Sequence, residues 1–254
     1  MKALRGIYSI YGFFVFVILM LLLFPFVVIA SFFGRVTGGN TIYTLCRLWA
    51  DSWFFLMAIR HTNIYEGALY KGQKIFVSNH ISYFDVPVMM KAVRSQNIRI
   101  LGKSELASIP IFGYIYRKAV VLVNRTSVSK RAASIKVLKS ILNKNISIFI
   151  CPEGTFNTTH KPLKQFYDGA FRIAIETQTP ISPILLLDTY DRLHYDNMLS
   201  LNPGKSRAVH LPTIFTDGLT LNDIQFLKAD VYKKMDEGLR RYHASWIVED
   251  IDLH

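Results

Sequence analysis

The chain has 254 residues and a formal net charge of +12, with 51% hydrophobic and 19% charged residues. This length suits one α/β domain plus an appendage, and the apolar fraction exceeds what a soluble core needs. The positive charge indicates an acidic partner, and because no Lys/Arg block with interleaved aromatic residues is present, lipid or phosphate is favoured and nucleic acid is excluded.

The N-terminal segment predicts a membrane-associated helical hairpin. Ile10 to Phe33 is uncharged and long enough to cross a hydrocarbon core of about 30 Å, and it is too long for the apolar part of a signal peptide. Pro25 predicts a kink or a re-entrant bend. After a turn signal at Gly38-Gly39-Asn40, residues 41–60 predict an amphipathic interfacial helix in which Arg47 and Asp51 pair. We expect residues 1–60 to dock on one leaflet of a membrane.

Residues 61–254 predict an α/β domain. Apolar runs bounded by turn residues predict strands at Lys74–Ser78, Ile98–Leu101, Val120–Val123, Ser147–Cys151, Ile181–Leu187 and Ala208–Phe215. Helices are predicted between them at Val86–Val93, Lys130–Leu142 and Gly169–Thr177, and an apolar stripe predicts a last helix over Asn222–Tyr242.

A histidine and an aspartate stand where the first of these strands runs into a helix. His80 follows the strand, and Asp85 precedes Pro87 at the helix start. The two side chains meet only if the chain turns between them. Asp85 then accepts a proton from one ring nitrogen and leaves the other free to act as a general base. A loop histidine beside an ordinary Asp N-cap is the alternative for so short a pattern.

Other candidate functional residues also follow predicted strands. Pro152-Glu153-Gly154-Thr155 continues one strand, so Glu153 is placed to order a basic neighbour or a substrate hydroxyl; a simple turn is the alternative. Lys103 and Arg125 each follow or end a strand and suit an anionic substrate, unless they are surface charges. Cys46 and Cys151 are too few for a disulfide framework and lack metal-ligand spacing, so a reducing compartment is expected.

Together, four blocks in order resemble the glycerolipid acyltransferase family that contains bacterial 1-acylglycerol-3-phosphate acyltransferases. They are NHISYFD (79–85), KSELASIPIFG (103–113) followed by Arg125, PEGT (152–155) and TPISPI (179–184). The chain departs from the family pattern twice: Phe156 stands where arginine usually follows EGT, and Lys118-Ala119-Val120 lacks a usual glycine. Both departures lie near the expected phosphate site of the acceptor.

The resemblance implies a mixed sheet covered by helices and an acyl transfer without metal or cofactor. His80 would be the base, Asp85 its orienter and Lys103 a candidate for the oxyanion. Arg125 and Glu153, with Gly154 and Thr155, would bind the substrate.

The implied donor is acyl-CoA or acyl carrier protein, and the implied acceptor is a lysophospholipid at the cytoplasmic face of the inner membrane. A lyso-aminolipid acceptor, suggested by Phe156, and a non-catalytic membrane adaptor with the same fold are the alternatives.

Overall fold

A computed structural model describes residues 2–123 and 128–248 of the chain, and within them the strands form one seven-stranded mixed sheet. The strand order is β1-β7-β6-β2-β5-β3-β4, and every neighbouring pair is parallel except β6 and β7. The strands are β1 (Ile59–Tyr65), β2 (Ile75–Ser78), β3 (Ile98–Lys103), β4 (Val120–Val123), β5 (Ser147–Ile150), β6 (Ile181–Leu186) and β7 (Gly204–His210). The expected mixed sheet is therefore confirmed.

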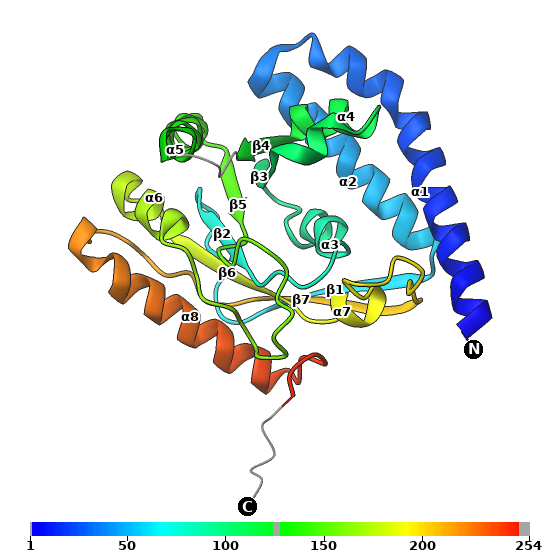
Figure 1. The fold of residues 1–254 in the computed structure, drawn as a ribbon. Coiled ribbons are helices and arrows are strands. Elements are labelled where there is room, and N and C mark those ends of the chain that lie inside the picture. The colour runs from blue at the N-terminus through cyan, green and yellow to red at the C-terminus, as the bar shows by residue number, and fades with distance from the viewer. Residues whose placement is uncertain (1, 124–127, 249–254) are drawn as a thin grey trace, which may run out of the picture.

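Helices cover both faces of this sheet (Figure 1). The helices are α1 (Lys2–Ser31), α2 (Gly39–Leu56), α3 (Asp85–Ala92), α4 (Phe112–Ala119), α5 (Val128–Leu142), α6 (Gly169–Thr177), α7 (Thr189–Arg192) and α8 (Ile224–Arg241). One apolar core lies between the sheet and α5, α6 and α8, and a second joins the other face to α1, α2 and α3. Strands β2, β5 and β6 are buried along their whole length, which explains their continuous apolar sequences.

The N-terminal hairpin forms, but its turn lies earlier than expected. Helix α1 continues through Pro25, and the chain reverses near Gly34, whose φ is +77°. Gly38 and Gly39 are helical; a Cβ on Gly38 would lie 2.2 Å from the Ala30 carbonyl oxygen, and one on Gly39 would lie 2.4 Å from a guanidinium nitrogen of Arg99. The expected turn at Gly38 and Gly39 is therefore wrong. These glycines permit close packing against Ala30 and Arg99 instead.

The expected pairing of Arg47 with Asp51 is also wrong. Asp51 pairs with Lys91 and with Arg94, whose Nη1 lies 2.8 Å from Asp51 Oδ2. Arg47 instead donates to the Arg94 carbonyl at 2.6 Å. Helix α2 packs against α3, and this contact brings Lys91 and Arg94 closer to the Asp51 carboxylate than Arg47 on the same helix.

Both ends of α1 are fixed to the rest of the chain. Near its start, Trp53 Nε1 donates to the Gly12 carbonyl at 2.9 Å and the Tyr8 hydroxyl donates to the Met57 carbonyl at 2.5 Å. Beyond its end, the buried guanidinium of Arg99 on β3 donates to the carbonyls of Arg35 and Val36. Helix α1 therefore lies along α2, and the turn after it is bonded to β3.

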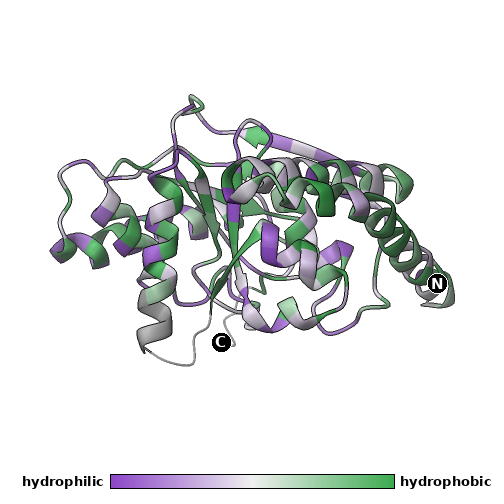
Figure 2. Ribbon diagram, turned by 90° about the horizontal axis from the view of Figure 1, so that it is seen from above, coloured by the Kyte–Doolittle hydropathy of each residue, from purple (hydrophilic) through white to green (hydrophobic). Residues whose placement is uncertain are grey.

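The outer face of α1 is apolar and exposed (Figure 2). An 18-residue window within Ala3–Ser31 has a mean hydropathy of 3.2, and this helix is the segment of the described chain that is long and apolar enough to cross a membrane. Its most exposed side chains include Leu4, Ile7, Ile10, Phe13, Phe14, Leu22, Phe26 and Ile29. A surface of this kind favours association with lipid.

Two strands differ from expectation. Strand β1 at the sheet edge was not expected, and β7 covers Gly204–His210 rather than Ala208–Phe215. Pro212 has no N–H to donate, so regular pairing ends before it, and beyond it only Ile214 makes an isolated bridge to Ile181.

Candidate active site

The candidate residues gather where parallel strands end. Strands β2, β5 and β3 are neighbours in this order, so their carboxyl ends share one edge of the sheet. His80 follows β2, the PEGT loop follows β5, and Lys103 ends β3. Loops at such an edge are the usual place for reactive groups in α/β proteins.

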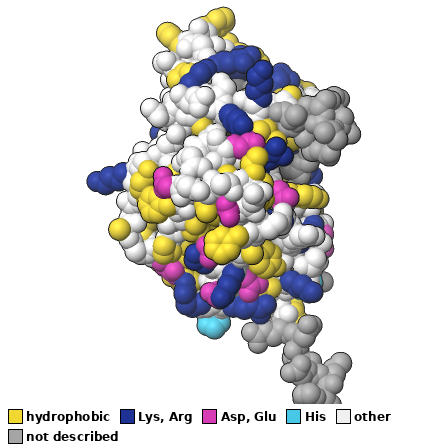
Figure 3. Space-filling view, turned by 90° about the vertical axis from the view of Figure 1, so that its left-hand side faces the viewer, with side chains coloured by type: hydrophobic (Ala, Val, Ile, Leu, Met, Phe, Trp, Pro, Cys, Tyr) yellow, Lys and Arg dark blue, Asp and Glu magenta, His cyan; other side chains and the backbone are white. Residues whose placement is uncertain are grey.

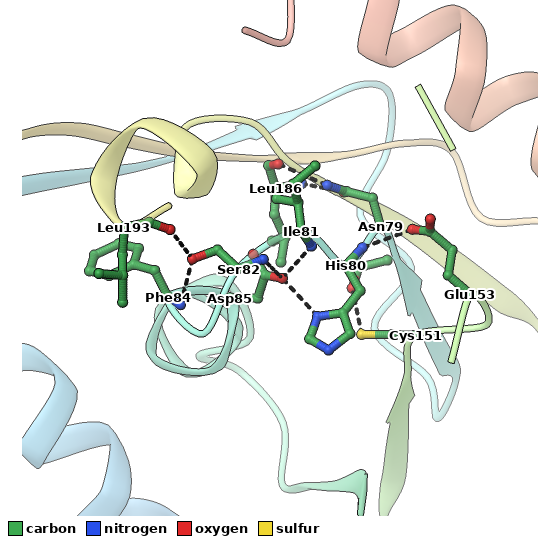
Figure 4. A network of polar contacts seen from close by, with 11 residues as sticks. Asn79, His80, Ile81, Ser82, Phe84, Asp85, Cys151, Glu153, Leu186 and Leu193 are labelled. Atoms are coloured by element: carbon green, nitrogen blue, oxygen red, sulfur yellow. Dashed lines mark hydrogen bonds and ion pairs between the residues drawn. The ribbon is translucent and has the colours of Figure 1, made fainter. Parts of the chain in front are cut away.

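His80 and Asp85 are in direct contact (Figure 4). His80 Nδ1 lies 2.7 Å from Asp85 Oδ2, and the same oxygen accepts the backbone N–H groups of Ile81 at 2.8 Å and Ser82 at 3.0 Å. Asp85 is fully buried, while the His80 side chain is 22% exposed. Asp85 is the first residue of α3 and its carboxylate folds back onto the turn. With a proton on Nδ1, the Nε2 of His80 is a proton acceptor.

Two polar side chains that the motif analysis gave no role fix this turn. The side-chain amide of Asn79 donates to the Leu186 carbonyl at 3.0 Å and accepts the Leu186 N–H at 2.8 Å, which ties the turn to β6. The Ser82 hydroxyl donates to the Leu193 carbonyl and accepts the Phe84 N–H at 3.0 Å. Small polar residues between a strand and a helix are the sequence signal that predicts such bonds.

Glu153 holds the backbone of His80. Its Oε1 accepts the His80 N–H at 2.9 Å and its Oε2 accepts the Lys164 N–H at 2.8 Å, and Glu153 is 2% exposed. Asn157 N–H also donates to the His80 carbonyl, at 2.7 Å. Each oxygen of Glu153 accepts a backbone N–H group, so the side chain holds the histidine loop in place, and its expected contact with the substrate stays a prediction.

The burial of Glu153 makes stability depend on pH. Desolvation raises the pKa of Glu153 to about 8, although the two N–H donors favour the ionised form. A carboxyl with a raised pKa contributes stability at low pH that is lost as the pH rises through the folded pKa. We expect the melting temperature of the wild type, relative to Glu153→Gln, to fall between about pH 5 and pH 8.5. A constant or rising difference would contradict this assignment.

The rest of the PEGT loop lies beside the imidazole. Gly154 has a φ of +75°, which suits glycine, and the Thr155 side chain is exposed. The Phe156 ring makes edge contacts with the rings of His80 and Tyr83, with centroids 4.5 Å and 4.7 Å apart. Lys164 Nζ donates to Thr155 Oγ1 at 2.7 Å. The Phe156 ring therefore borders the candidate base, and the Lys164 ammonium lies against the backbone and side chain of the same loop, at Phe156 and Thr155.

Of the two cations predicted to bind the anionic substrate, Lys103 lies within the described residues and Arg125 does not. Lys103 is exposed, and its backbone N–H donates to the hydroxyl of Tyr116, so a role in binding an oxyanion would fall to its side chain. Arg125 lies outside the described residues. Across residues 2–123 and 128–248, no group of three or more His, Cys, Asp and Glu side chains is placed to hold a metal ion.

Cys151 directly follows β5 (Ser147–Ile150), next to the site. Its Sγ lies 3.4 Å from the Ser78 hydroxyl. A hydroxyl acceptor can attack a thioester directly, so no acyl-cysteine is needed. We expect Cys151→Ser to keep near-wild-type turnover, measured as thiol release from an acyl thioester. A covalent acyl adduct on Cys151, detected by mass spectrometry, would contradict this prediction.

Comparison with known proteins yields a consistent set of matches. A family model described as Acyltransferase matches residues 58–187. A protein of Caenorhabditis elegans named putative 1-acyl-sn-glycerol-3-phosphate acyltransferase is 30% identical over 66% of this chain and 60% of its own length. The 1-acyl-sn-glycerol-3-phosphate acyltransferase of Haemophilus influenzae is 27% identical over 64% of this chain and 67% of its own length.

The fold also matches a solved structure. The crystal structure of the 1-acyl-sn-glycerophosphate acyltransferase PlsC from Thermotoga maritima superposes with a TM-score of 0.73 at 21% identity, covering 98% of this chain and all of that chain. The matched region spans about 60% of the first two curated relatives and about half of a third.

Proposed function

Because the chain belongs to the acyltransferase family, we propose that this acyltransferase moves a fatty acyl group from acyl-CoA or acyl carrier protein to the free hydroxyl of 1-acylglycerol-3-phosphate, forming phosphatidic acid. The observation that carries the proposal is the His80–Asp85 pair: a buried carboxylate, held by two backbone N–H groups, orients a partly exposed imidazole at the shared carboxyl edge of the sheet.

The chemistry follows from this geometry. His80 Nε2 takes the proton of the acceptor hydroxyl as its oxygen bonds to the thioester carbon, and Asp85 stabilises the imidazolium that forms. The carbonyl oxygen becomes an oxyanion, for which the Lys103 side chain is the proposed partner. When the carbon–sulfur bond breaks, the imidazolium returns its proton to the leaving thiolate. No acyl-enzyme is required.

The acceptor's phosphate needs a cation near the PEGT loop. Phe156 carries no charge, but Lys164 Nζ lies 2.7 Å from Thr155 Oγ1 and 3.4 Å from the Phe156 carbonyl oxygen. We propose that Lys164 supplies the charge, together with Arg125. The aromatic contacts of Phe156 with His80 and Tyr83 favour a second candidate, a lyso-lipid with an amine head group, because aromatic faces attract cations.

Variants that change the charge of the PEGT loop test whether Lys164 binds the phosphate of the acceptor lipid. We expect Lys164→Ala to raise the KM for lysophosphatidic acid about ten- to a hundredfold, since a charge-assisted hydrogen bond contributes about 1.5–3 kcal/mol, while the exposed neighbour variant Lys161→Ala changes little. Adding Phe156→Arg to Lys164→Ala should restore the KM. The measurement is acyl transfer from a labelled donor to a panel of lyso-lipids.

The same panel tests the proposed function itself. Transfer by the wild type to lysophosphatidic acid supports it. A wild type that ignores lysophosphatidic acid but acylates a lyso-aminolipid would establish the second candidate instead, and Phe156→Arg should then gain activity on lysophosphatidic acid.

Membrane association is proposed through the first 60 residues, with residues 61–254 as the catalytic domain. Near the start of α1, Arg5 Nε donates to the Ser200 carbonyl at 2.8 Å, and at its end the Ser31 hydroxyl lies 2.7 Å from the Tyr114 hydroxyl. Helix α1 is therefore bonded at both ends to residues of the proposed catalytic domain, with one apolar side outward. This arrangement supports a hairpin in one leaflet of the cytoplasmic membrane rather than a span. The cytoplasmic side fits the proposed acyl donors.

A further inference from the structure

Asn157 is a buried polar residue just beyond the PEGT motif, and it is 2% exposed. Its side-chain amide is bonded through both of its ends. Oδ1 accepts the N–H of Thr159 at 3.0 Å and the hydroxyl of Thr159 at 2.7 Å, and Nδ2 donates to the Lys161 carbonyl at 2.8 Å. An asparagine side chain that bonds to the backbone two residues on closes a turn. The amide of Asn157 therefore shapes the chain between its own backbone and the Lys161 carbonyl.

The backbone of Asn157 in turn holds the candidate base. The N–H of Asn157 donates to the His80 carbonyl at 2.7 Å, and Oε1 of Glu153 accepts the His80 N–H at 2.9 Å (Figure 4). Both backbone polar groups of His80 are thus bonded to the short segment that follows β5. Asp85, on α3, holds the imidazole ring through Nδ1 at 2.7 Å. Different segments of the chain therefore fix the backbone and the ring of His80.

The same turn places an aromatic ring against the imidazole. Phe156 directly precedes Asn157, and its ring centroid lies 4.5 Å from that of His80. A shift of the backbone at Asn157 would therefore change two contacts of His80 at once, the hydrogen bond to its carbonyl and the ring beside its side chain. A displacement of about 1 Å can lower catalysis about a hundredfold, because the reacting atoms must be aligned.

The segment beyond the turn is held by the protein's own core. The Tyr232 hydroxyl, on α8, donates to the Leu163 carbonyl at 3.2 Å, and Leu163 and Phe166 are buried in the cluster that includes residues of α6 and α8. The outer face that bears α8 mixes charges of both signs with apolar residues, which is the ordinary composition of a surface in water (Figure 3). Bonds within the chain therefore hold this segment, and the amide of Asn157 supplies those that shape it next to His80.

We propose that Asn157 is a positioning residue for the general base: its side-chain amide sets the turn from which the Asn157 N–H and the Phe156 ring hold His80 in its working orientation. The proposal rests on the proposed function in taking His80 as the base. Asn157 touches no reacting atom and acts through His80. Without its amide, the His80 turn takes several arrangements, and only a fraction of them let Nε2 reach the acceptor hydroxyl.

The kinetics of Asn157→Ala test this role. The variant removes the acceptor of both Thr159 donors and the donor to the Lys161 carbonyl, while position 157 keeps its backbone N–H. We expect kcat to fall about ten- to a hundredfold and the KM for the acceptor to stay within about twofold, because the alignment of the base changes and the binding groups do not. The measurement is thiol release from an acyl thioester with the preferred acceptor of the lyso-lipid panel.

Gln73→Ala is the matched control. The Gln73 amide also donates to two backbone carbonyls, those of Leu142 and Ile146, but Gln73 precedes β2 and so lies at the opposite edge of the sheet from His80. Both alanine variants should lower the melting temperature, and Gln73→Ala should keep the wild-type kcat. Equal falls in kcat in the two variants would indicate a general loss of stability and would overturn the proposal.

Proton NMR of the full chain in detergent observes the imidazole without substrate, so its outcome does not depend on the proposed function. The Nδ1 proton of His80, bonded to Asp85, should give a downfield resonance that is absent from His80→Ala. We expect the resonance to persist in Gln73→Ala and to broaden or disappear in Asn157→Ala, because a mobile imidazole exchanges this proton with water faster. An unchanged resonance in a folded Asn157→Ala would overturn the proposal.

Thr159→Val is a milder second variant. It removes only the hydroxyl that donates to Asn157 Oδ1 and keeps the backbone N–H of position 159. We expect a fall in kcat of about two- to fivefold, in line with the loss of one neutral hydrogen bond, and a partly broadened His80 resonance. If Asn157→Ala does not fold, a Thr159→Val variant with wild-type kcat and an unchanged resonance would overturn the proposal.

Discussion

His80→Ala should lower acyl transfer about a hundred- to ten-thousandfold while the protein remains folded. General-base catalysis contributes about 10²- to 10⁴-fold, and the described site offers no second imidazole bonded to a buried carboxylate at this edge of the sheet. The side chain is partly exposed and its ring contacts Phe156 at its edge, so its loss removes little packing. The measurement is thiol release from an acyl thioester in detergent, with lysophosphatidic acid as acceptor.

A matched histidine variant controls for unspecific effects. His160 lies on an exposed loop with a φ of +58°, a conformation that asparagine tolerates, so His160→Asn should keep both turnover and melting temperature. Near-normal turnover by His80→Ala, with lysophosphatidic acid still acylated, would remove His80 from the proposed mechanism.

Asp85→Asn should lower turnover by about two to four orders of magnitude, because it removes the negative charge beside the imidazole. Asp85 Oδ2 accepts three hydrogen bonds, while Oδ1 is buried without a partner among the described residues. An asparagine can place its oxygen at the Oδ2 position and its NH₂ at the Oδ1 position, so the turn keeps its shape. The imidazolium formed in the reaction would then lack its counter-charge.

Two measurements separate this effect from misfolding. The KM for the acceptor should change little while kcat falls, because Asp85 is buried away from substrate. Asp85→Ala, which also removes the acceptor for the Ile81 and Ser82 N–H groups, should lower the melting temperature more than Asp85→Asn. Equal melting temperatures for the two variants would contradict a structural role for these bonds.

Continuous apolar strands and periodic helices were predictable from the sequence. Strand β4 and helix α6 have the expected bounds, because each is set by local apolar pattern and turn residues. Strand β1, IRHTNIY, was not predictable in this way: it lies at the sheet edge and is fixed by pairing with β7, about 145 residues later in the chain. Helix α4, FGYIYRKA, is rich in aromatic residues that favour strands, and tertiary packing decides its form.

Contacts of the candidate site between residues close in sequence were predictable, and contacts between separate loops were not. His80 and Asp85 are five residues apart, so one turn brings them together. The two oxygens of Glu153 select backbone N–H groups of His80 and Lys164, and a sequence carries no signal for such partners. The contact of Phe156 with His80 likewise depends on how two loops approach each other.

The attachment of α1 at both ends determines how a water-soluble form can be made. Its inner face contributes Val15, Val27 and Ala30 to buried clusters that also include residues of α2 and the sheet. Removing the helix would uncover these clusters and leave the Tyr114 hydroxyl without its partner, the Ser31 hydroxyl. Polar substitutions confined to outward positions such as Ile10 would keep the inner face intact. A water-soluble form should therefore be sought by polar substitutions on the outer face of α1 and not by deleting the helix.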